Sequence, residues 1–139
     1  MANAIVDWAA AKKCKMMISI GGMAIQDRQD LDRPKVFAAV SSDSMIKSMS
    51  EKGIELLSEG YVVGPYAVML RRCAEVSIPA VTLLAQSFYN YPDPEAAAAA
   101  ITELSRRRLV GFRVYFCSRL EPNVMVSMQS KSRVSVFLA

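Results

Sequence analysis

The stretch of residues 59–95 constrains the fold more than any other part of the chain. A turn containing glycine leads to Pro65, and proline suits the first position of a helix. Pro79 cannot continue that helix, so the apolar run at 80–85 is predicted to be a buried strand. Asp93 then precedes a proline, a glutamate and five alanines, which is the pattern of a capped helix. The stretch therefore predicts a helix, a strand and a second helix in succession.

The residues before this stretch alternate in the same way. Gly21 and Gly22 are expected to end the first strand, and a polar loop rich in Asp and Arg, rather than a helix, joins it to the next. In the helix that follows the later glycine turn, Ala67, Leu70 and Ala74 are expected to share the buried face. The expected helices cover residues 2–13 and 43–52, and the expected strands cover 15–20, 36–40 and 54–58.

Helices that alternate with short apolar strands indicate one α/β domain, in which helices cover both faces of a mostly parallel sheet. Such a domain normally begins with a strand, whereas this chain begins inside a predicted helix. The sheet is therefore expected to be incomplete at its N-terminal side, as in a fragment or a truncated homologue. The domain is expected to cover residues 1–110. Residues 111–139 form a divergent tail of uncertain structure, which could pair as edge strands.

Composition and charge indicate the class of protein. Hydrophobic residues make up 53% of the 139 residues, no apolar run reaches the roughly 18 residues of a membrane span, and the start lacks a secretory signal. We therefore expect a cytoplasmic protein with no membrane partner. The net charge is only +4, and its densest cluster, residues 106–108, suits a helix C-terminus, so no nucleic-acid partner is predicted. Three scattered cysteines predict neither a disulfide framework nor a zinc site.

The absence of histidine limits the chemistry that this chain can perform. Serine–histidine and cysteine–histidine catalysis are excluded, and the commonest metal ligand is missing. Asp27, Asp30 and Asp32 could supply oxygen ligands, but their loop lacks the turn glycine and the terminal glutamate of a calcium loop. We interpret it as a solvated polar loop. No catalytic residue, metal or cofactor is predicted.

A crevice at the carboxyl ends of the strands is where a ligand or a partner is expected. The turn at 60–65 ends at a helix N-terminus, whose free N–H groups could hold an anion. The aromatic residues within 88–91 could anchor an interface, because Tyr and Phe give large rigid contacts, or could merely cover the next helix. The residues expected to line this crevice are Gly21, Gly22, Tyr61, Gly64, Gln86, Tyr89, Tyr91 and Asp93.

Three elements of the sequence are distinctive together. They are the turn with Gly60 and Gly64, the run IPAVTLLA at 78–85, and a tyrosine followed by P-D-P-x-A-A-A at 91–98. In these elements, and over roughly residues 2–106, the chain resembles the archaeal form of the proteasome assembly chaperone family. The resemblance implies a Rossmann-like, phosphorylase-like three-layer fold, a homo-oligomer, and a role in helping proteasome α-subunits assemble. Relatives are sometimes labelled as members of the ATP-grasp superfamily, but no nucleotide site is recognised in this sequence.

Two features depart from that family. The glycine-rich first strand and turn of its members are absent here. Members that dock on the proteasome carry a penultimate tyrosine, whereas this chain ends Phe137-Leu138-Ala139. Docking through this C-terminus is therefore not expected.

The sequence leaves three hypotheses for the function. The first is a non-enzymatic assembly or binding protein that acts through protein surfaces. The second is an enzyme that binds a nucleoside or a phosphate-type anion in the crevice, with carboxylates from Asp93, Glu59 or the loop at 27–32. The third is a truncated chain with only an oligomerising structural role.

Overall fold

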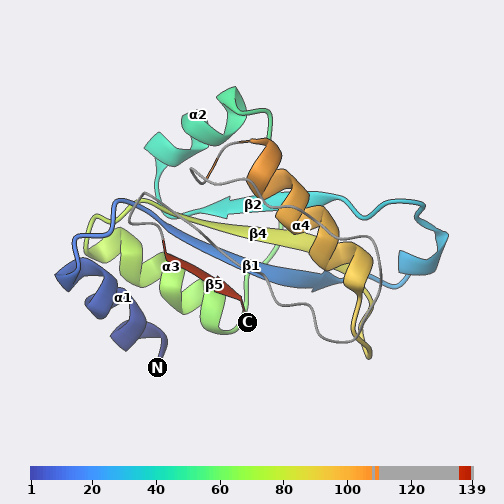
Figure 1. Ribbon diagram of the computed structural model, residues 1–139, viewed down its shortest axis with the longest axis horizontal. Coiled ribbons are helices and arrows are strands. Elements are labelled where there is room, and N and C mark those ends of the chain that lie inside the picture. The colour runs from blue at the N-terminus through green and yellow to red at the C-terminus, as the bar shows by residue number, and fades with distance from the viewer. Residues whose placement is uncertain (108, 110–134, 139) are drawn as a thin grey trace.

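Figure 1 shows the computed structural model of the chain, which describes residues 1–107, Leu109 and residues 135–138. The helices are α1 (Ala2–Ala11), α2 (Asp43–Glu51), α3 (Pro65–Glu75) and α4 (Pro94–Arg106), with a short 3₁₀ helix, η1 (Arg28–Asp30). The strands are β1 (Met17–Ala24), β2 (Val36–Val40), β3 (Glu55–Leu56), β4 (Ala80–Ser87) and β5 (Ser135–Leu138). Most of the expected tail, residues 111–134 and 139, lies outside the described residues. Within the described residues, no helix is long and apolar enough to cross a membrane.

The five strands form one mixed sheet in the order β3-β2-β4-β1-β5. β4 lies at its centre, parallel to β1 and antiparallel to β2. β3 runs parallel to β2, and β5 runs parallel to β1. Three of the four strand pairs are therefore parallel, so the predicted mostly parallel sheet is confirmed. The predicted loop between β1 and β2 contains only η1. β1 and β2 lie on either side of β4 and run in opposite directions, so no crossover helix is needed between them.

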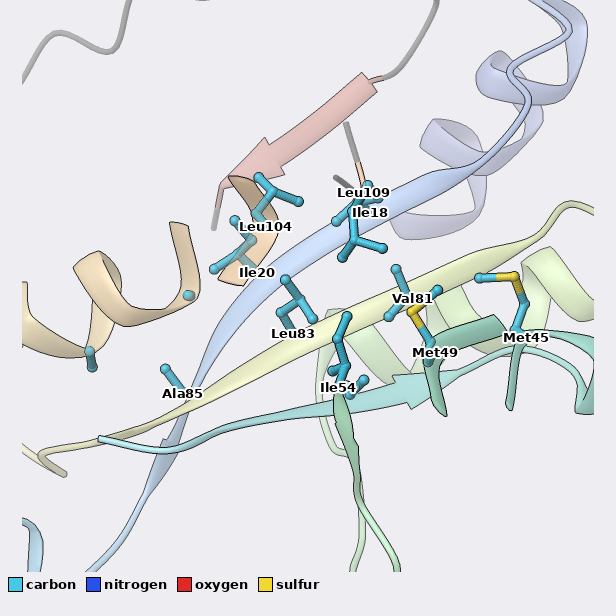
Figure 2. Close-up of a cluster of buried hydrophobic side chains, with 13 residues drawn as sticks. Ile18, Ile20, Met45, Met49, Ile54, Val81, Leu83, Ala85, Leu104 and Leu109 are labelled. Carbon is cyan, nitrogen blue, oxygen red and sulfur yellow. The ribbon is translucent and has the colours of Figure 1, made fainter. Parts of the chain in front are cut away.

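Helices cover both faces of this sheet and make a three-layer α/β sandwich (Figure 1). Side chains of β4 alternate between the two faces, as a strand requires. Val81, Leu83 and Ala85 point into the core beneath α2 and α4, where they meet Ile18 and Leu104 (Figure 2). The opposite core, beneath α1 and α3, contains residues from β1, β4 and both helices. The expected α/β class is confirmed.

The capped helix predicted after Asp93 is confirmed as α4. The Asp93 carboxylate accepts a hydrogen bond of 2.9 Å from the N–H of Ala96. Ala96, Ala100 and Leu104 are buried, and their spacing of four residues places them on one face. This face packs on the sheet, so the N-cap and the buried face both stabilise α4.

α3 begins at its predicted proline, but its buried face is not the predicted one. Met69 and Cys73 are buried, while Leu70 is only partly buried and Ala74 is exposed. The larger side chains remove more apolar surface from water than the two alanines of the predicted face, Ala67 and Ala74, would. The face therefore lies one position earlier along the helix.

Gly21 and Gly22 do not end the first strand, and that prediction is wrong. Both lie inside β1 and pair with β4. A Cβ at Gly21 would lie 2.7 Å from Cζ of Tyr66, whose ring comes from α3, and a Cβ at Gly22 would lie 2.6 Å from Oγ of Ser87. Glycine in a strand often marks a close approach of other groups. These two glycines mark such an approach and not a turn.

Candidate functional site

The carboxyl ends of β1 and β4 meet at one edge of the sheet. The last register pairs are Met23 with Gln86 and Ala24 with Ser87. β2 starts at the same edge because it runs antiparallel to β4, and the N–H of Lys35 donates a hydrogen bond of 2.9 Å to Oε1 of Gln86. The loop from β1 to β2 and the loop from β4 to α4 therefore both begin at this edge.

A buried arginine joins these two loops. Arg28, in η1, is 2% exposed. Its Nε donates to Oδ2 of Asp93 at 2.7 Å, and its Nη2 donates to Oδ1 of Asp93 at 3.2 Å and to Oε2 of Glu95 at 2.9 Å. Its Nη1 donates to the carbonyl of Leu31 at 3.2 Å. These contacts raise the pKa of Arg28, through the hydrogen bonds to Glu95 and then to Asp93.

Asp93 serves the helix and the ion pair at once. Besides capping α4 and binding Arg28, its Oδ2 accepts a hydrogen bond of 3.3 Å from the N–H of Phe88. Burial raises the pKa of Asp93, but the hydrogen bond from Ala96, the Arg28 guanidinium and the Phe88 N–H outweigh it, so this pKa lies below its ordinary value. Asp93 is therefore ionised at neutral pH, and its two oxygens bind the helix cap, the guanidinium and the Phe88 N–H.

The same arginine holds the aromatic loop, which we define as residues 88–91. The guanidinium carbon of Arg28 lies 5.1 Å from the centre of the Phe88 ring, and the centres of the Phe88 and Tyr91 rings are 4.8 Å apart. Tyr89 and Tyr91 nevertheless remain 83% and 62% exposed. The loop thus has a fixed inner ring and two tyrosines that face solvent.

The structure brings together only part of the crevice predicted from the sequence. Gln86, Tyr89, Tyr91 and Asp93 all lie at the edge where β4 ends. Gly21 and Gly22 lie inside β1, three and two positions before its last residue, Ala24.

Tyr61 and Gly64 belong to the loop that follows β3. That strand runs antiparallel to β1 and β4, so its carboxyl end lies at the opposite edge of the sheet. The chain then returns toward β1 before α3, because the Tyr66 ring lies beside Gly21 and Gly64 precedes Tyr66 by two residues. The direction of β3 therefore does not by itself bring Tyr61 and Gly64 to the edge where β4 ends.

Arg28 is the residue that sequence reasoning missed. It lies in the loop interpreted as solvated, between Asp27 and Asp30. A buried charge is exceptional unless it is paired, and its partners are 65 and 67 residues away. No local signal distinguishes such an arginine from an exposed one.

A groove of about 640 Å³ lies beside this edge, between α4 and the start of β2. It shares Glu95 with the Arg28 contacts but contains none of the predicted crevice residues. Positive and negative side chains balance in number around it, so no charge preference for a ligand follows. Its lining residues are Asp32, Arg33, Pro34, Lys35, Val36, Gly53, Glu55, Glu95, Ala98, Ala99, Thr102, Glu103, Arg106 and Arg107.

The chemistry of the described residues offers little to a reaction. Burial raises the pKa of Cys73 to about 11, so its reactive thiolate form is scarce at neutral pH. Among residues 1–107, 109 and 135–138, no group of acidic side chains and cysteines is arranged to hold a metal ion. The exposed tyrosines are better suited to contact than to catalysis.

Solved structures with a similar fold come from archaea and bacteria. Pyrococcus furiosus PbaA, an archaeal homolog of proteasome-assembly chaperone, matches with a TM-score of 0.72 and 24% identity over 80% of this chain and 48% of that one. P. furiosus PbaB, an archaeal proteasome activator, matches with a TM-score of 0.66 and 21% identity over 76% and 46%. A Mycobacterium tuberculosis proteasome-assembly chaperone homologue matches with a TM-score of 0.56 and 20% identity over 78% and 44%.

This chain therefore spans about half the length of the structures that it matches. At these identities the likeness concerns the fold. No curated protein matches the sequence. The PAC2 family model matches residues 1–120, which include every described element except β5. The chain belongs to the PAC2 family.

Proposed function

We propose that this protein is a non-enzymatic binding protein that helps proteasome α-subunits assemble, and that it contacts them through the aromatic loop. The proposal takes its partner from the structural neighbours, which are described as a homolog of proteasome-assembly chaperone, a proteasome activator and a chaperone homologue. It includes a cytoplasmic location and a homo-oligomeric state. It does not include nucleotide binding, which an ATP-grasp relationship would imply.

The single observation that carries the proposal is the arrangement of Tyr89 and Tyr91. Tyrosine is frequent at the energetic centre of protein interfaces, where a large ring is buried at a small cost in conformational entropy. Both rings are mostly exposed, yet their loop is tied to the fold through Phe88 and Asp93. An exposed aromatic pair on a fixed loop is a preorganised contact surface.

The proposal is tested by binding of the purified chain to proteasome α-subunits. The double variant Tyr89→Ala/Tyr91→Ala is expected to bind at least about 30-fold more weakly, which corresponds to about 2 kcal/mol. The matched control is Tyr61→Ala, because Tyr61 is 97% exposed and lies outside the aromatic loop. It is expected to bind like the unaltered chain.

Two results would overturn parts of the proposal. If the unaltered chain fails to bind α-subunits or to promote their ring assembly, the proposed function is wrong. If Tyr61→Ala weakens binding as strongly as the double variant, the contact surface is assigned to the wrong loop. Similar thermal stability of all three chains is required for either interpretation. The exposure of Tyr61 and Tyr89 predicts it at those positions, and loss of the Phe88–Tyr91 ring contact is expected to cost only about 0.5–1.5 kcal/mol.

A further inference from the structure

We propose that Arg28 is a positioning residue for the aromatic loop, and that the affinity for a partner depends on the forked shape of its guanidinium and not only on its charge. This inference rests on the proposed function, since the loop is the surface assigned to the partner. Arg28 touches neither exposed tyrosine in the described contacts. It acts on them through Phe88 and Asp93.

The geometry is specific to an arginine. Three of its nitrogens donate in three directions, to one carboxylate twice, to a second carboxylate, and to the carbonyl of Leu31. The central carbon of the same group also lies over the Phe88 ring. A lysine ammonium is a compact charge without a planar fork, so it cannot make the paired contact to Asp93 and hold a charge over the ring at the same time.

One carboxylate ties both ends of the aromatic loop. Oδ2 of Asp93 accepts from Nε of Arg28 and also from the N–H of Phe88, the first residue of the loop. Oδ1 of Asp93 accepts from Ala96 in the first turn of α4. When Arg28 is lost, the carboxylate keeps its cap on the helix, but its Oδ2 keeps only the longer hydrogen bond from the Phe88 N–H among the described contacts, and the Phe88 ring loses its contact with the guanidinium.

The burial of this ion pair supports a role in geometry over a role in stability. The side chains of Arg28 and Asp93 are 2% and 4% exposed. Removing two charges from water offsets most of their attraction, so a buried pair adds little net stability although it demands one arrangement of its partners. The pair also connects η1 with α4, two elements that are not neighbours in sequence. It therefore sets where the aromatic loop points.

A conservative variant separates the fork from the charge. Arg28→Lys keeps the positive charge and is expected to fold, while Arg28→Met removes the charge as well and leaves the two carboxylates unpaired. The matched control is Arg72→Lys, because Arg72 pairs with Asp7 and Glu75 on the surface of α1 and α3, on the other face of the sheet.

Two readouts are measured on the full chain. The first is hydrogen exchange of the Phe88 and Ala96 amides, both of which donate to Asp93. Arg28→Lys is expected to speed exchange at Phe88 by about tenfold or more while Ala96 changes little, since the cap survives. The second is affinity for proteasome α-subunits, expected to fall roughly tenfold in Arg28→Lys and to stay unchanged in Arg72→Lys.

The outcomes are distinguishable from failure of the proposed function. If the unaltered chain does not bind α-subunits, the proposed function fails, and the exchange measurement alone then decides whether Arg28 fixes the loop. The inference is overturned if Arg28→Lys leaves Phe88 exchange unchanged. It is also overturned if exchange rises equally throughout the chain, because that result reports general destabilisation, or if affinity is kept although the Phe88 amide is exposed.

Discussion

The close contact between β1 and α3 can be tested with a single methyl group. Gly21 lies in the middle of β1, and a Cβ added there would meet the Tyr66 ring at 2.7, 2.8 and 2.9 Å from Cζ, Cε2 and the hydroxyl oxygen. Contacts between carbon atoms are most favourable at about 3.5–4.0 Å. The Gly21→Ala change therefore requires the ring to retreat by close to 1 Å.

Two opposing effects determine whether Gly21→Ala raises or lowers the free energy of unfolding. In an open strand, alanine is more favourable than glycine by roughly 0.5–1 kcal/mol, because the unfolded chain has less freedom to lose. Overpacking of a filled site costs roughly 1–3 kcal/mol. Since Tyr66 is only partly buried, its ring can yield in part. We expect a net loss of about 0.5–2 kcal/mol in the free energy of unfolding.

The assay is urea unfolding followed by circular dichroism, in a double-mutant cycle with Tyr66→Ala. Without the ring, Gly21→Ala is expected to stabilise the chain by roughly 0.5–1 kcal/mol, so the effect changes sign. Gly22→Ala is the control. Its methyl group meets Oγ of Ser87, which can rotate away about a single bond, and Cβ of Ser87 at 3.3 Å, a mildly tight contact that offsets the preference for alanine. Its effect is expected to stay within about 0.5 kcal/mol.

The reasoning is refuted if Gly21→Ala has the same effect with and without the Tyr66 ring. It is also refuted if the single variant is more stable than the unaltered chain. Either result would mean that Gly21 is there for a reason other than the approach of α3.

Two further predictions concern titratable groups. Because the pKa of Asp93 lies below its ordinary value of 3.8, its stabilising contribution is present above that pH and is lost as the pH falls through the folded-state value. The Asp93→Asn variant can still cap α4, but it is expected to lose about 1–3 kcal/mol of folding stability at pH 7. Between about pH 5 and pH 2, thermal unfolding is expected to show a smaller loss of stability in this variant than in the unaltered chain. Parallel stability curves for the two chains would contradict this. Because burial raises the pKa of Cys73 to about 11, its alkylation at pH 8 is expected to be roughly 100-fold or more slower in the folded chain than in urea, measured by peptide mass spectrometry. Equal rates in both conditions would show that this thiol is accessible.

The sequence was sufficient for the parts of the fold that depend on neighbouring residues. Asp93 and the residues after it specify their helix through a cap and through alanine propensity, and Pro65 opens α3. The strand β4 was found because Pro79 ends a helix and an apolar run follows. These signals act within one turn or one strand, so the helices and the strand that they specify can be predicted from neighbouring residues alone.

The parts that failed depend on residues far apart in sequence. Gly21 has the appearance of a turn residue because its actual constraint, the Tyr66 ring, comes from α3. The direction of β3 relative to β4 cannot be predicted from the residues of β3, because it is set by tertiary packing. The burial of Arg28 cannot be predicted from the residues beside it, because burial of a charge depends on its partners, which here lie far away in sequence. Aromatic residues at the strand end were identified, but the group that orients them was not.

The position of β4 at the centre of the sheet has a consequence for synthesis. Among the described residues, β1 pairs only with β4 and β5, and β2 pairs otherwise only with the two residues of β3. During translation, β1 therefore has neither of these partners until residues 80–87 have left the ribosome. The buried apolar residues of β1 stay unpaired over the synthesis of more than fifty further residues, the interval in which a nascent chain is open to chaperones or to aggregation. The sheet of a protein that we propose assists assembly thus forms only after β4, its central strand, has been synthesised.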